Sequence, residues 1–380
     1  MIVKIWDFPN WGDQLNKLLF KILTNEDITY SHAYENIQQQ HYIGIGSILE
    51  YAEEQSIIWG TGFITKSTIP TKPLKIHAVR GKKTRDVFIK NNIDCPEVYG
   101  DPSIVFSLFY KPKINKTHKI GIIKHHFDKN NYEGYIINED PSLNSPYCYI
   151  DAICNCEKIM SSSLHGLIIA DIYGIPSEQI KIGLDQFKFE DYYSAKEEAD
   201  PIKLLKNCPL KKNIKNDGNL LLKINLGSND IRIPGFLNID IVKYKNVDII
   251  ANCKDLPFQD NIASEILASH IIEHFDFHEG LEALKEWHRI LSPGGKLTIE
   301  CPDLDYFCRN FILLPEHEKP NYYCQLFGFP WEKGQGHKFG YTPSQLKWSL
   351  KECGFKYFKK IPATRYNNIN EWNQKYEAIK

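Results

Sequence analysis

Cysteine pairs with metal-binding spacing are absent from this sequence of 380 residues. Its ten cysteines are scattered, without a Cys-x-x-Cys pair or a Cys and His spacing that suits zinc. We therefore expect reduced thiols and no metal site. Long apolar runs are absent too, since none approaches the roughly 20 residues that span a bilayer. Asp7, Pro9 and Asn10 interrupt the apolar start that a signal peptide needs, so we expect a cytoplasmic protein without a transmembrane segment.

A strong charge of either sign is also missing. Lys and Arg number 46 and Asp and Glu 47, so the net charge is -1, and no long block of one sign occurs. This balance argues against nucleic acid or an acidic membrane as a partner. Hydrophobic residues make up 42% of the chain and aromatic residues 13%, which is ample for packed cores. The length exceeds what one core usually organises, so we expect two or three domains.

The chain has one clear predicted boundary. Residues 208–219 are polar and rich in turn formers, so they are expected to link a first half, 1–207, to a second half, 220–380. A weaker joint near 111–118 divides the first half into lobes of about 1–112 and 118–207. Apolar strands alternate with amphipathic segments throughout, a pattern that predicts an α/β fold with Rossmann-like lobes.

The second half contains strands that end in residues suited to a nucleoside. One strand runs into Gly227, where small side chains let a ligand approach the backbone. The next strand ends at Asp240, whose carboxylate can accept hydrogen bonds from both ribose hydroxyls. Later strand ends supply groups for an adenine ring and a methyl donor. The predicted cofactor-binding residues are Gly227, Ser228, Asn229, Asp240, Asn252, Cys253, Leu256 and Ser269.

Nearly the whole second half resembles the class I S-adenosylmethionine-dependent methyltransferases of the type-11 kind. The matching segments are 226–228, 234–240, 256–258, 269–270 with 273–274, and 291–297. Two positions depart from the family pattern, because Asn229 replaces a glycine and Asn252 replaces an acid. Asn tolerates left-handed backbone angles, so the first turn can still form. The resemblance implies S-adenosylmethionine as co-substrate, His270 as a catalytic residue and His274 as a substrate contact.

The first half contains three glycine turns after apolar runs, at residues 10–13, 44–47 and 59–62. Backbone N–H groups at such turns bind phosphates and carboxylates. Arg80 adds a cationic fork that suits either anion. His125 ends a predicted strand, and His165 follows three serines at the start of a predicted helix. A helix start favours negative ligands.

Up to about Ser194, this half resembles the polysaccharide pyruvyl transferase family. The most specific matches are residues 161–166, 100–102, 59–62 and 188–193, while Lys124 and His126 stand where the family has proline and tyrosine around the histidine. The resemblance implies a GT-B-like pair of lobes and phosphoenolpyruvate as donor. It also implies His165 as the acid, Arg80 and Lys188 as anion clamps, and His125 as a further catalytic residue. The implied substrate contacts are Asn10, Gly12, Asp13, Gly46, Ser47, Ser162, Ser163 and Lys188.

Together the two halves predict a bifunctional transferase that ketalises a saccharide with pyruvate and methylates a saccharide hydroxyl. The expected acceptor is a saccharide or polysaccharide precursor, free or lipid-linked. One alternative is a methyltransferase whose first half has lost its chemistry and binds a glycan. Another is a GT-B-type glycosyltransferase fused to a methyltransferase. Consumption of phosphoenolpyruvate separates the bifunctional enzyme from the binding module. Protection against unfolding by a nucleoside diphosphate sugar, but not by phosphoenolpyruvate, favours the glycosyltransferase.

Overall fold

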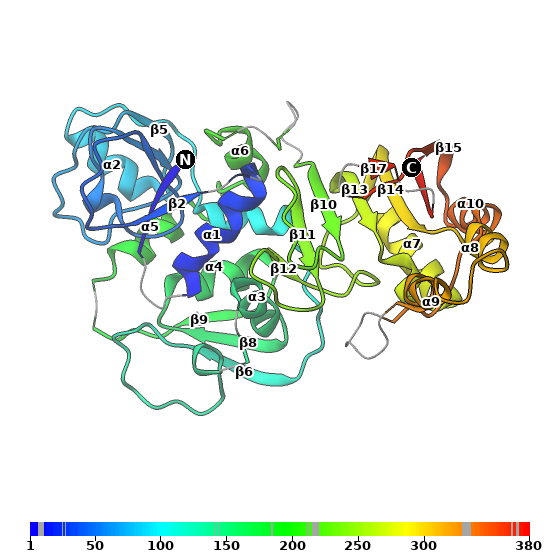
Figure 1. Cartoon of the computed structure of the whole chain (residues 1–380). Coiled ribbons are helices and arrows are strands. Elements are labelled where there is room, and N and C mark those ends of the chain that lie inside the picture. Colours follow the sequence, from blue (N-terminus) through cyan, green and yellow to red (C-terminus); the bar gives the residue numbers. More distant parts are fainter. Residues whose placement is uncertain are drawn as a thin grey trace. The chain divides into compact units, whose positions relative to one another are not determined.

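The computed structural model describes residues 1–6, 11–24, 26, 28–140, 142–143, 145–183, 185–210, 213–214, 220–328, 336–365, 368–369 and 372–380. Within them the chain forms two compact units, Met1–Leu220 and Leu221–Lys380. Unit 1 runs from blue to green and unit 2 from green to red in Figure 1. In the part of the chain so described, no helix combines the length and the apolar character needed to cross a membrane.

Unit 1 begins with a parallel sheet of strand order β2-β1-β3-β4-β5. Its central strands are short apolar runs, such as Ile57-Ile58-Trp59, that are buried on both faces because helices and loops cover the sheet. The elements of this lobe are β1 (Ile2–Ile5), α1 (Trp11–Thr24), β2 (Thr29–His32), β3 (His41–Ile43), η1 (Leu49–Tyr51), β4 (Ser56–Trp59), β5 (Lys75–Ala78), α2 (Lys82–Lys90) and η2 (Pro102–Leu108).

A second parallel sheet of order β7-β6-β8-β9 follows in unit 1. Helix α4 is largely apolar and is buried from Leu164 to Ala170, as expected for a helix enclosed by other elements. The elements are β6 (His118–Ile123), β7 (Tyr135–Ile136), η3 (Ile137–Glu139), α3 (Pro146–Cys154), β8 (Cys156–Ser161), α4 (Leu164–Ile172) and β9 (Ser177–Gln179). Two parallel sheets confirm the predicted pair of Rossmann-like lobes.

The last helices of unit 1 return to the first lobe. Helix α5 (Phe187–Ala195) lies against α2 (Figure 1) and contributes Phe187 and Ala195 to the apolar core of the first sheet. Helix α6 (Pro201–Lys206) packs on η2, and Trp59 Nε1 donates a 3.0 Å hydrogen bond to the carbonyl of Leu204. The expected second lobe, 118–207, thus ends in helices that are bound to the first.

Unit 2 is built around a sheet of order β12-β11-β10-β13-β14-β18-β15. All neighbouring strands are parallel except β18, which is antiparallel to both β14 and β15. This is the Rossmann-like arrangement that the sequence predicted for the second half. The strands are β10 (Leu222–Leu226), β11 (Leu237–Asp240), β12 (Ile249–Ile250), β13 (Ala263–Ser269), β14 (Leu291–Pro302), β15 (Lys356–Ile361) and β18 (Asn373–Ile379), beside a small pair, β16 (Thr364–Arg365) and β17 (Asn368–Ile369).

Helix α7 packs against the sheet of unit 2 through one apolar face. Asp276 caps its first turn in a capping box with Glu279. One face buries Leu284 and Trp287, and Trp287 Nε1 donates a 2.9 Å hydrogen bond to the Cys253 carbonyl in the turn after β12. The helical elements of unit 2 are η4 (Ile272–His274), α7 (Phe277–Ile290), α8 (Leu304–Phe311), α9 (Lys319–Phe327) and α10 (Pro343–Glu352).

The return of α5 to the first lobe depends on a buried ion pair, which yields a stability prediction. Arg80 Nε lies 2.9 Å from Asp191 Oδ2, and neither side chain is exposed to solvent. Replacing Asp191 by Ala leaves the guanidinium buried without its partner. We expect a loss of about 3–5 kcal/mol in the free energy of unfolding, measured by urea denaturation of the whole chain. The matched control is Glu190→Ala, because the neighbouring Glu190–Lys83 pair lies at the surface. Equal denaturation midpoints for the two variants would contradict the prediction.

Candidate functional site

The candidate residues of unit 1 lie at the carboxyl ends of its parallel strands, from both lobes. The segment after β1 leads into α1, which carries Gly12 and Asp13 in its first turn. The turn after β3 carries Gly46 and Ser47, and β8 leads through three serines into α4, which carries His165. The two lobes meet here, since a Cβ built on Gly12 would lie 2.2 Å from Nδ1 of His165. Asn10 lies outside the described residues.

His165 faces a buried carboxylate. Its Nε2 lies 3.7 Å from Asp101 Oδ2, and neither atom has a hydrogen-bond partner among the described residues. The other oxygen, Asp101 Oδ1, accepts hydrogen bonds from Ser103 N (2.9 Å) and Ser103 Oγ (2.7 Å), which hold the carboxylate in place. Burial opposes ionisation of Asp101, but the charge of His165 and the hydrogen bonds from Ser103 give a net lowering of its pKa. The geometry pairs an imidazole with an oriented anion.

Sequence reasoning gave Asp101 no role, although it noted the Gly100-Asp101-Pro102 segment. Asp101 is the N-cap of η2 and lies two residues after Tyr99, which forms a bridge with Val79. A polar residue after an extended apolar segment was the available signal. Its proximity to His165 was not visible, because the two residues come from different lobes.

Asp13 is a second buried carboxyl group at this site. Its pKa is raised from 3.8 to about 6, mainly by burial and in part by the nearby Asp101, although His165 and Lys188 oppose the rise. A Cβ on Gly46 would lie 2.9 Å from Asp13 Oδ1, and Gly46 has a φ of +130°. A residue with a side chain would therefore be strained there and would displace the carboxyl group. The group is thus poised to exchange protons near neutral pH.

Lys188, on α5, provides a cation near these groups. Burial lowers the pKa of its ammonium group from 10.5 to about 8, the charge of Arg80 lowers it too, and Asp13 raises it. The ammonium group is still mostly protonated at pH 7. It lies 5.3 Å from the ring centre of Phe189 on the same helix. Lys188 can therefore hold an anion at the site.

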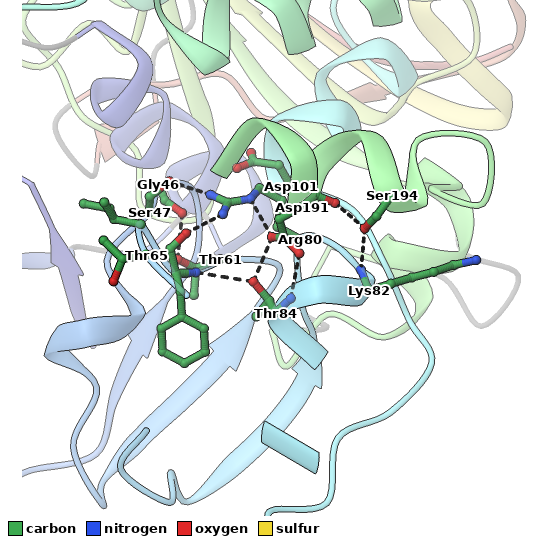
Figure 2. A network of polar contacts seen from close by, with 12 residues as sticks. Gly46, Ser47, Thr61, Thr65, Arg80, Lys82, Thr84, Asp101, Asp191 and Ser194 are labelled. Atoms are coloured by element: carbon green, nitrogen blue, oxygen red, sulfur yellow. Dashed lines mark hydrogen bonds and ion pairs between the residues drawn. The ribbon is translucent and has the colours of Figure 1, made fainter. Parts of the chain in front are cut away.

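Arg80 is committed to contacts within the protein (Figure 2). Besides the ion pair with Asp191, its Nη1 donates to Ser47 Oγ and its Nη2 donates to the carbonyl of Phe63 at 2.7 Å. Asp191 also accepts hydrogen bonds from the backbone and the hydroxyl of Thr84, both at 2.7 Å. Only 1% of Arg80 is exposed. These contacts connect the turn after β3 to α5, the helix that carries Lys188.

The predicted serines and His125 form one hydrogen-bonded group in the second lobe. Ser162 Oγ donates to Asp128 Oδ2 at 2.6 Å and accepts from His125 N at 2.9 Å. Ser163 is the N-cap of α4, and its N–H donates to Ser161 Oγ at 3.0 Å. Burial lowers the pKa of His125 to about 3, with further lowering by the charges of Lys188 and His126. His125 is therefore neutral at physiological pH.

In unit 2, the first turn and the second strand meet as a nucleoside site requires. Asp240, at the end of β11, accepts hydrogen bonds from Asn229 N (2.8 Å, on Oδ2) and Val242 N (2.9 Å, on Oδ1). Gly227 has a φ of +62° and Asn229 a φ of +49°, the left-handed region that Gly and Asn tolerate. A Cβ on Gly227 would lie 2.8 Å from Ile271 Cδ1. The turn is closely packed, so backbone groups rather than side chains are presented at the carboxyl end of β10.

The residues expected around adenine lie beside that turn. The Cys253 thiol has its pKa raised to about 12, first by burial and then by the charge of Asp240, while a backbone contact of Gly227 opposes the rise. The thiol therefore stays protonated. Asn252 Oδ1 accepts from Lys254 N at 3.0 Å. The backbone N–H of the buried Leu256 donates to Glu286 Oε1 at 2.7 Å. Hydrogen bonds at Lys254 and Leu256 thus hold the backbone of residues 252–256 in place.

Strand β13 ends at Ser269. The next residue is His270, which has a φ of +54°. Its Nδ1–H donates to Glu273 Oε1 at 2.9 Å, and its Nε2 accepts from the amide of Asn373 at 2.8 Å. His274 contacts the Gly336 carbonyl through Nδ1 at 3.1 Å. Glu273, only 1% exposed, was not among the predicted residues. A histidine oriented by a buried carboxylate can act as a base.

Comparisons with known proteins match each of the two units to a different family. A family model described as polysaccharide pyruvyl transferase matches residues 10–177, and a model described as methyltransferase domain matches residues 234–299. The chain is also 30% identical over 267 residues to the uncharacterized protein L143 of Acanthamoeba polyphaga mimivirus. That match covers 64% of this chain and 85% of the viral protein, so the two belong to one family.

Similar solved structures are S-adenosylmethionine-dependent methyltransferases. One from Archaeoglobus fulgidus has 16% identity and a TM-score of 0.29, and covers 42% of this chain and 86% of that one. One from Methanosarcina mazei has 17% identity and a TM-score of 0.30, and covers 41% of this chain and 91% of that one.

The raised pKa of Asp13 predicts a pH-dependent stability. Because folding raises this pKa from 3.8 to about 6, the folded chain binds more protons than the unfolded chain between these values. Its stability therefore falls as the pH rises through this window, by about 3 kcal/mol in total. The Asp13→Asn variant lacks this cost. Urea denaturation should show the variant gaining stability relative to wild type from pH 4 to pH 7. A difference that is independent of pH would contradict the prediction.

Proposed function

The first unit of this chain belongs to the polysaccharide pyruvyl transferases and the second is a methyltransferase, and we propose that the chain adds both a pyruvate ketal and a methyl group to a saccharide. The observation that carries the proposal is the pair of atoms His165 Nε2 and Asp101 Oδ2, which face each other at 3.7 Å where the lobes of unit 1 meet. Neither atom has a hydrogen-bond partner in the part of the chain that the structure describes. Such a pair supports proton transfer rather than structure alone.

Pyruvyl transfer needs a proton at one carbon and loses two protons elsewhere. His165 gives a proton to the methylene carbon of phosphoenolpyruvate, which makes the neighbouring carbon electrophilic. One saccharide hydroxyl attacks that carbon, the bond to phosphate breaks, and a second hydroxyl closes the ketal. One hydroxyl proton leaves with phosphate, and the other restores His165 by way of Asp13, whose pKa of about 6 suits a proton carrier. Asp101 stabilises the protonated imidazole.

The donor carries a carboxylate and a phosphate, so the site must hold negative charge. We assign this role to Lys188, which stays cationic at pH 7. Arg80 acts as a positioning residue, because its contacts to Ser47 and Asp191 hold the turn and the helix that surround Lys188. The neutral His125 and the turn residues Gly12, Gly46, Ser47, Ser162 and Ser163 are proposed to contact the substrates, as is Asn10.

For unit 2 we propose S-adenosylmethionine as the methyl donor. Asp240 fits the ribose, since each of its oxygens accepts a backbone hydrogen bond and a carboxylate oxygen can accept a second one. Ser228 and Asn229 are proposed to present backbone groups, with Asn252, Cys253 and Leu256 beside the adenine. The bound cofactor supplies an electrophilic methyl group on a sulfonium. Alignment of a hydroxyl with that group supplies most of the rate.

His270 is the proposed base for the methylated hydroxyl. Its Nδ1–H is bonded to Glu273, so the proton is accepted at Nε2 once the Asn373 amide yields that position to substrate. The buried carboxylate then stabilises the imidazolium. Ser269 is proposed to lie beside the methyl donor. The acceptor is a saccharide precursor, free or lipid-linked.

We further propose that the chain acts in the cytoplasm and without a nucleic-acid partner. The nine cysteines that the structure describes form no disulfide with one another, which supports a reducing environment. The net charge of -1 provides no field that would attract a polyanion. Covalent fusion keeps the product of one site at high effective concentration near the other.

The pyruvyl assignment predicts that His165→Asn lowers phosphate release from phosphoenolpyruvate about 10²–10⁴-fold, because the proton donor is lost. Released phosphate is measured with candidate saccharides as acceptors. The matched control is His118→Asn, at the amino end of β6 and so at the opposite edge of the sheet from His125. If wild type releases no phosphate but transfers sugar from a nucleoside diphosphate sugar, the glycosyltransferase alternative holds. If it does neither and still binds glycans, unit 1 is a binding module.

The cofactor assignment predicts that Asp240→Asn weakens binding of S-adenosylmethionine roughly 10–100-fold, since a charged hydrogen-bond acceptor is worth about 1.5–3 kcal/mol. Isothermal titration calorimetry of the whole chain measures the effect. Asp260→Asn is the isosteric control, because Asp260 precedes β13 at the amino edge of the sheet and pairs with Arg289. Unchanged affinity in the Asp240 variant would refute the ribose contact.

A further inference from the structure

Unit 2 contains a cluster of metal-ligating side chains, one of which, Glu273, also orients the proposed base His270. Glu273 and His274 lie on η4, directly after the end of β13, and His337 comes from a segment 63 residues later. One ligand atom from each of these three residues lies within 4.8 Å of the other two. The sequence predicted no metal site, because the residues are not spaced like a zinc motif.

Both imidazoles present the same nitrogen for coordination. His274 Nδ1 lies 3.1 Å from the carbonyl oxygen of Gly336, and His337 Nδ1 lies 3.0 Å from that of Leu326. A carbonyl oxygen can only accept, so each Nδ1 carries the hydrogen and each Nε2 keeps its lone pair. Histidines that bind metals are oriented in the same way, with the second ring nitrogen donating to a carbonyl or a carboxylate.

Glu273 contributes a carboxylate oxygen without a partner. Its Oε1 accepts from His270 Nδ1 at 2.9 Å, whereas its Oε2 is buried and has no hydrogen-bond partner among the described residues. The residue is 1% exposed. A buried carboxylate oxygen without a partner is costly, and a bound cation removes that cost. The contact with His270 also fixes the orientation of the carboxylate, as in known metal sites.

The backbone holds the cluster together before any ion binds. The N–H groups of Lys338 and Phe339 donate to the Glu273 carbonyl at 2.8 and 3.2 Å. His337 immediately precedes Lys338 in the chain. His274 contacts the carbonyl of Gly336, the residue before His337. A small cavity adjoins the cluster, with Glu273, His337, Leu304, Phe339 and Tyr341 among its lining residues. The arrangement is therefore preorganised and has adjacent space.

We propose that Glu273 Oε2, His274 Nε2 and His337 Nε2 form a binding site for a divalent transition metal of the zinc class. Two imidazoles and one carboxylate suit zinc, whereas Mg²⁺ and Ca²⁺ prefer sites made of oxygen atoms alone. With metal–ligand bonds of about 2.0–2.2 Å, tetrahedral ligand atoms lie roughly 3.4 Å apart. From separations of no more than 4.8 Å, the ligand atoms therefore approach one another by at most about 1.4 Å when the ion binds.

Three protein ligands leave the fourth position of a tetrahedral zinc ion open. Catalytic zinc sites share this feature, whereas structural sites fill all four positions. The role of the open position rests on the proposed methyl transfer: a saccharide hydroxyl bound there loses its proton more readily, because the cation stabilises the alkoxide. A hydroxyl activated in this way is a better nucleophile for the methyl group.

The test measures zinc on the whole chain without cofactor or saccharide, so its outcome is independent of the proposed methyl transfer. Chain stripped with a chelator is equilibrated with Zn²⁺, passed through a desalting column and analysed by inductively coupled plasma mass spectrometry. We expect one zinc ion per chain in wild type. The variant His274→Ala with His337→Ala, and Glu273→Gln separately, should lose that ion. The control is His278→Ala with His317→Ala, because both of these histidines are exposed.

Cobalt provides a second measurement that does not depend on how well a variant folds. Wild-type chain loaded with Co²⁺ should absorb visible light as a four- or five-coordinate ion with nitrogen and oxygen ligands. Zinc content at background in wild type would overturn the proposal, as would unchanged zinc content in the double variant. A charge-transfer band from thiolate to cobalt would also overturn it, since cysteines would then be the ligands.

Discussion

Parallel strands place the chemical groups of this protein, because the carboxyl ends of neighbouring parallel strands share one edge of a sheet. In unit 1 that edge holds the turns after β3 and β8, and in unit 2 it holds Gly227, Asp240 and His270 at the ends of β10, β11 and β13. Each group is reached from a buried apolar strand that cannot shift by one residue without exposing its side chains. The positions of the reactive groups therefore follow from the packing of the strands.

Contacts distant in sequence complete the site of unit 1. The buried Arg80–Asp191 pair brings α5 to the first lobe, and α5 carries Lys188. Two carboxyl groups at this site differ in their ionisation. Burial raises the pKa of Asp13 to about 6, whereas at Asp101 the charge of His165 and the hydrogen bonds from Ser103 outweigh burial and lower the pKa. A difference of this kind supports the proposed roles of Asp13 in proton transfer and of Asp101 as a fixed charge.

The sequence predicted the fold well, because apolar strands that end in glycine turns are a local signal. Local signals also led to Asp240 and Asn229, whose backbone contact the structure shows. Asp101 was missed, since its partner His165 comes from the other lobe and only folding brings the two near. Glu273 was not predicted either, although its partner His270 stands only three residues earlier. The cluster around His337 was hidden, as 63 residues separate His274 from it. Arg80 was expected to bind an anion, whereas its hydrogen bonds lie within the protein.

Mass spectrometry of a saccharide incubated with the whole chain, phosphoenolpyruvate and S-adenosylmethionine tests the joint activity most directly. Two sites on one chain predict a product that carries both a pyruvate ketal and a methyl ether. Each modification should disappear when its own donor is omitted. A saccharide that gains a methyl ether but never a ketal, across acceptors that the chain binds, would contradict the proposed two-step modification.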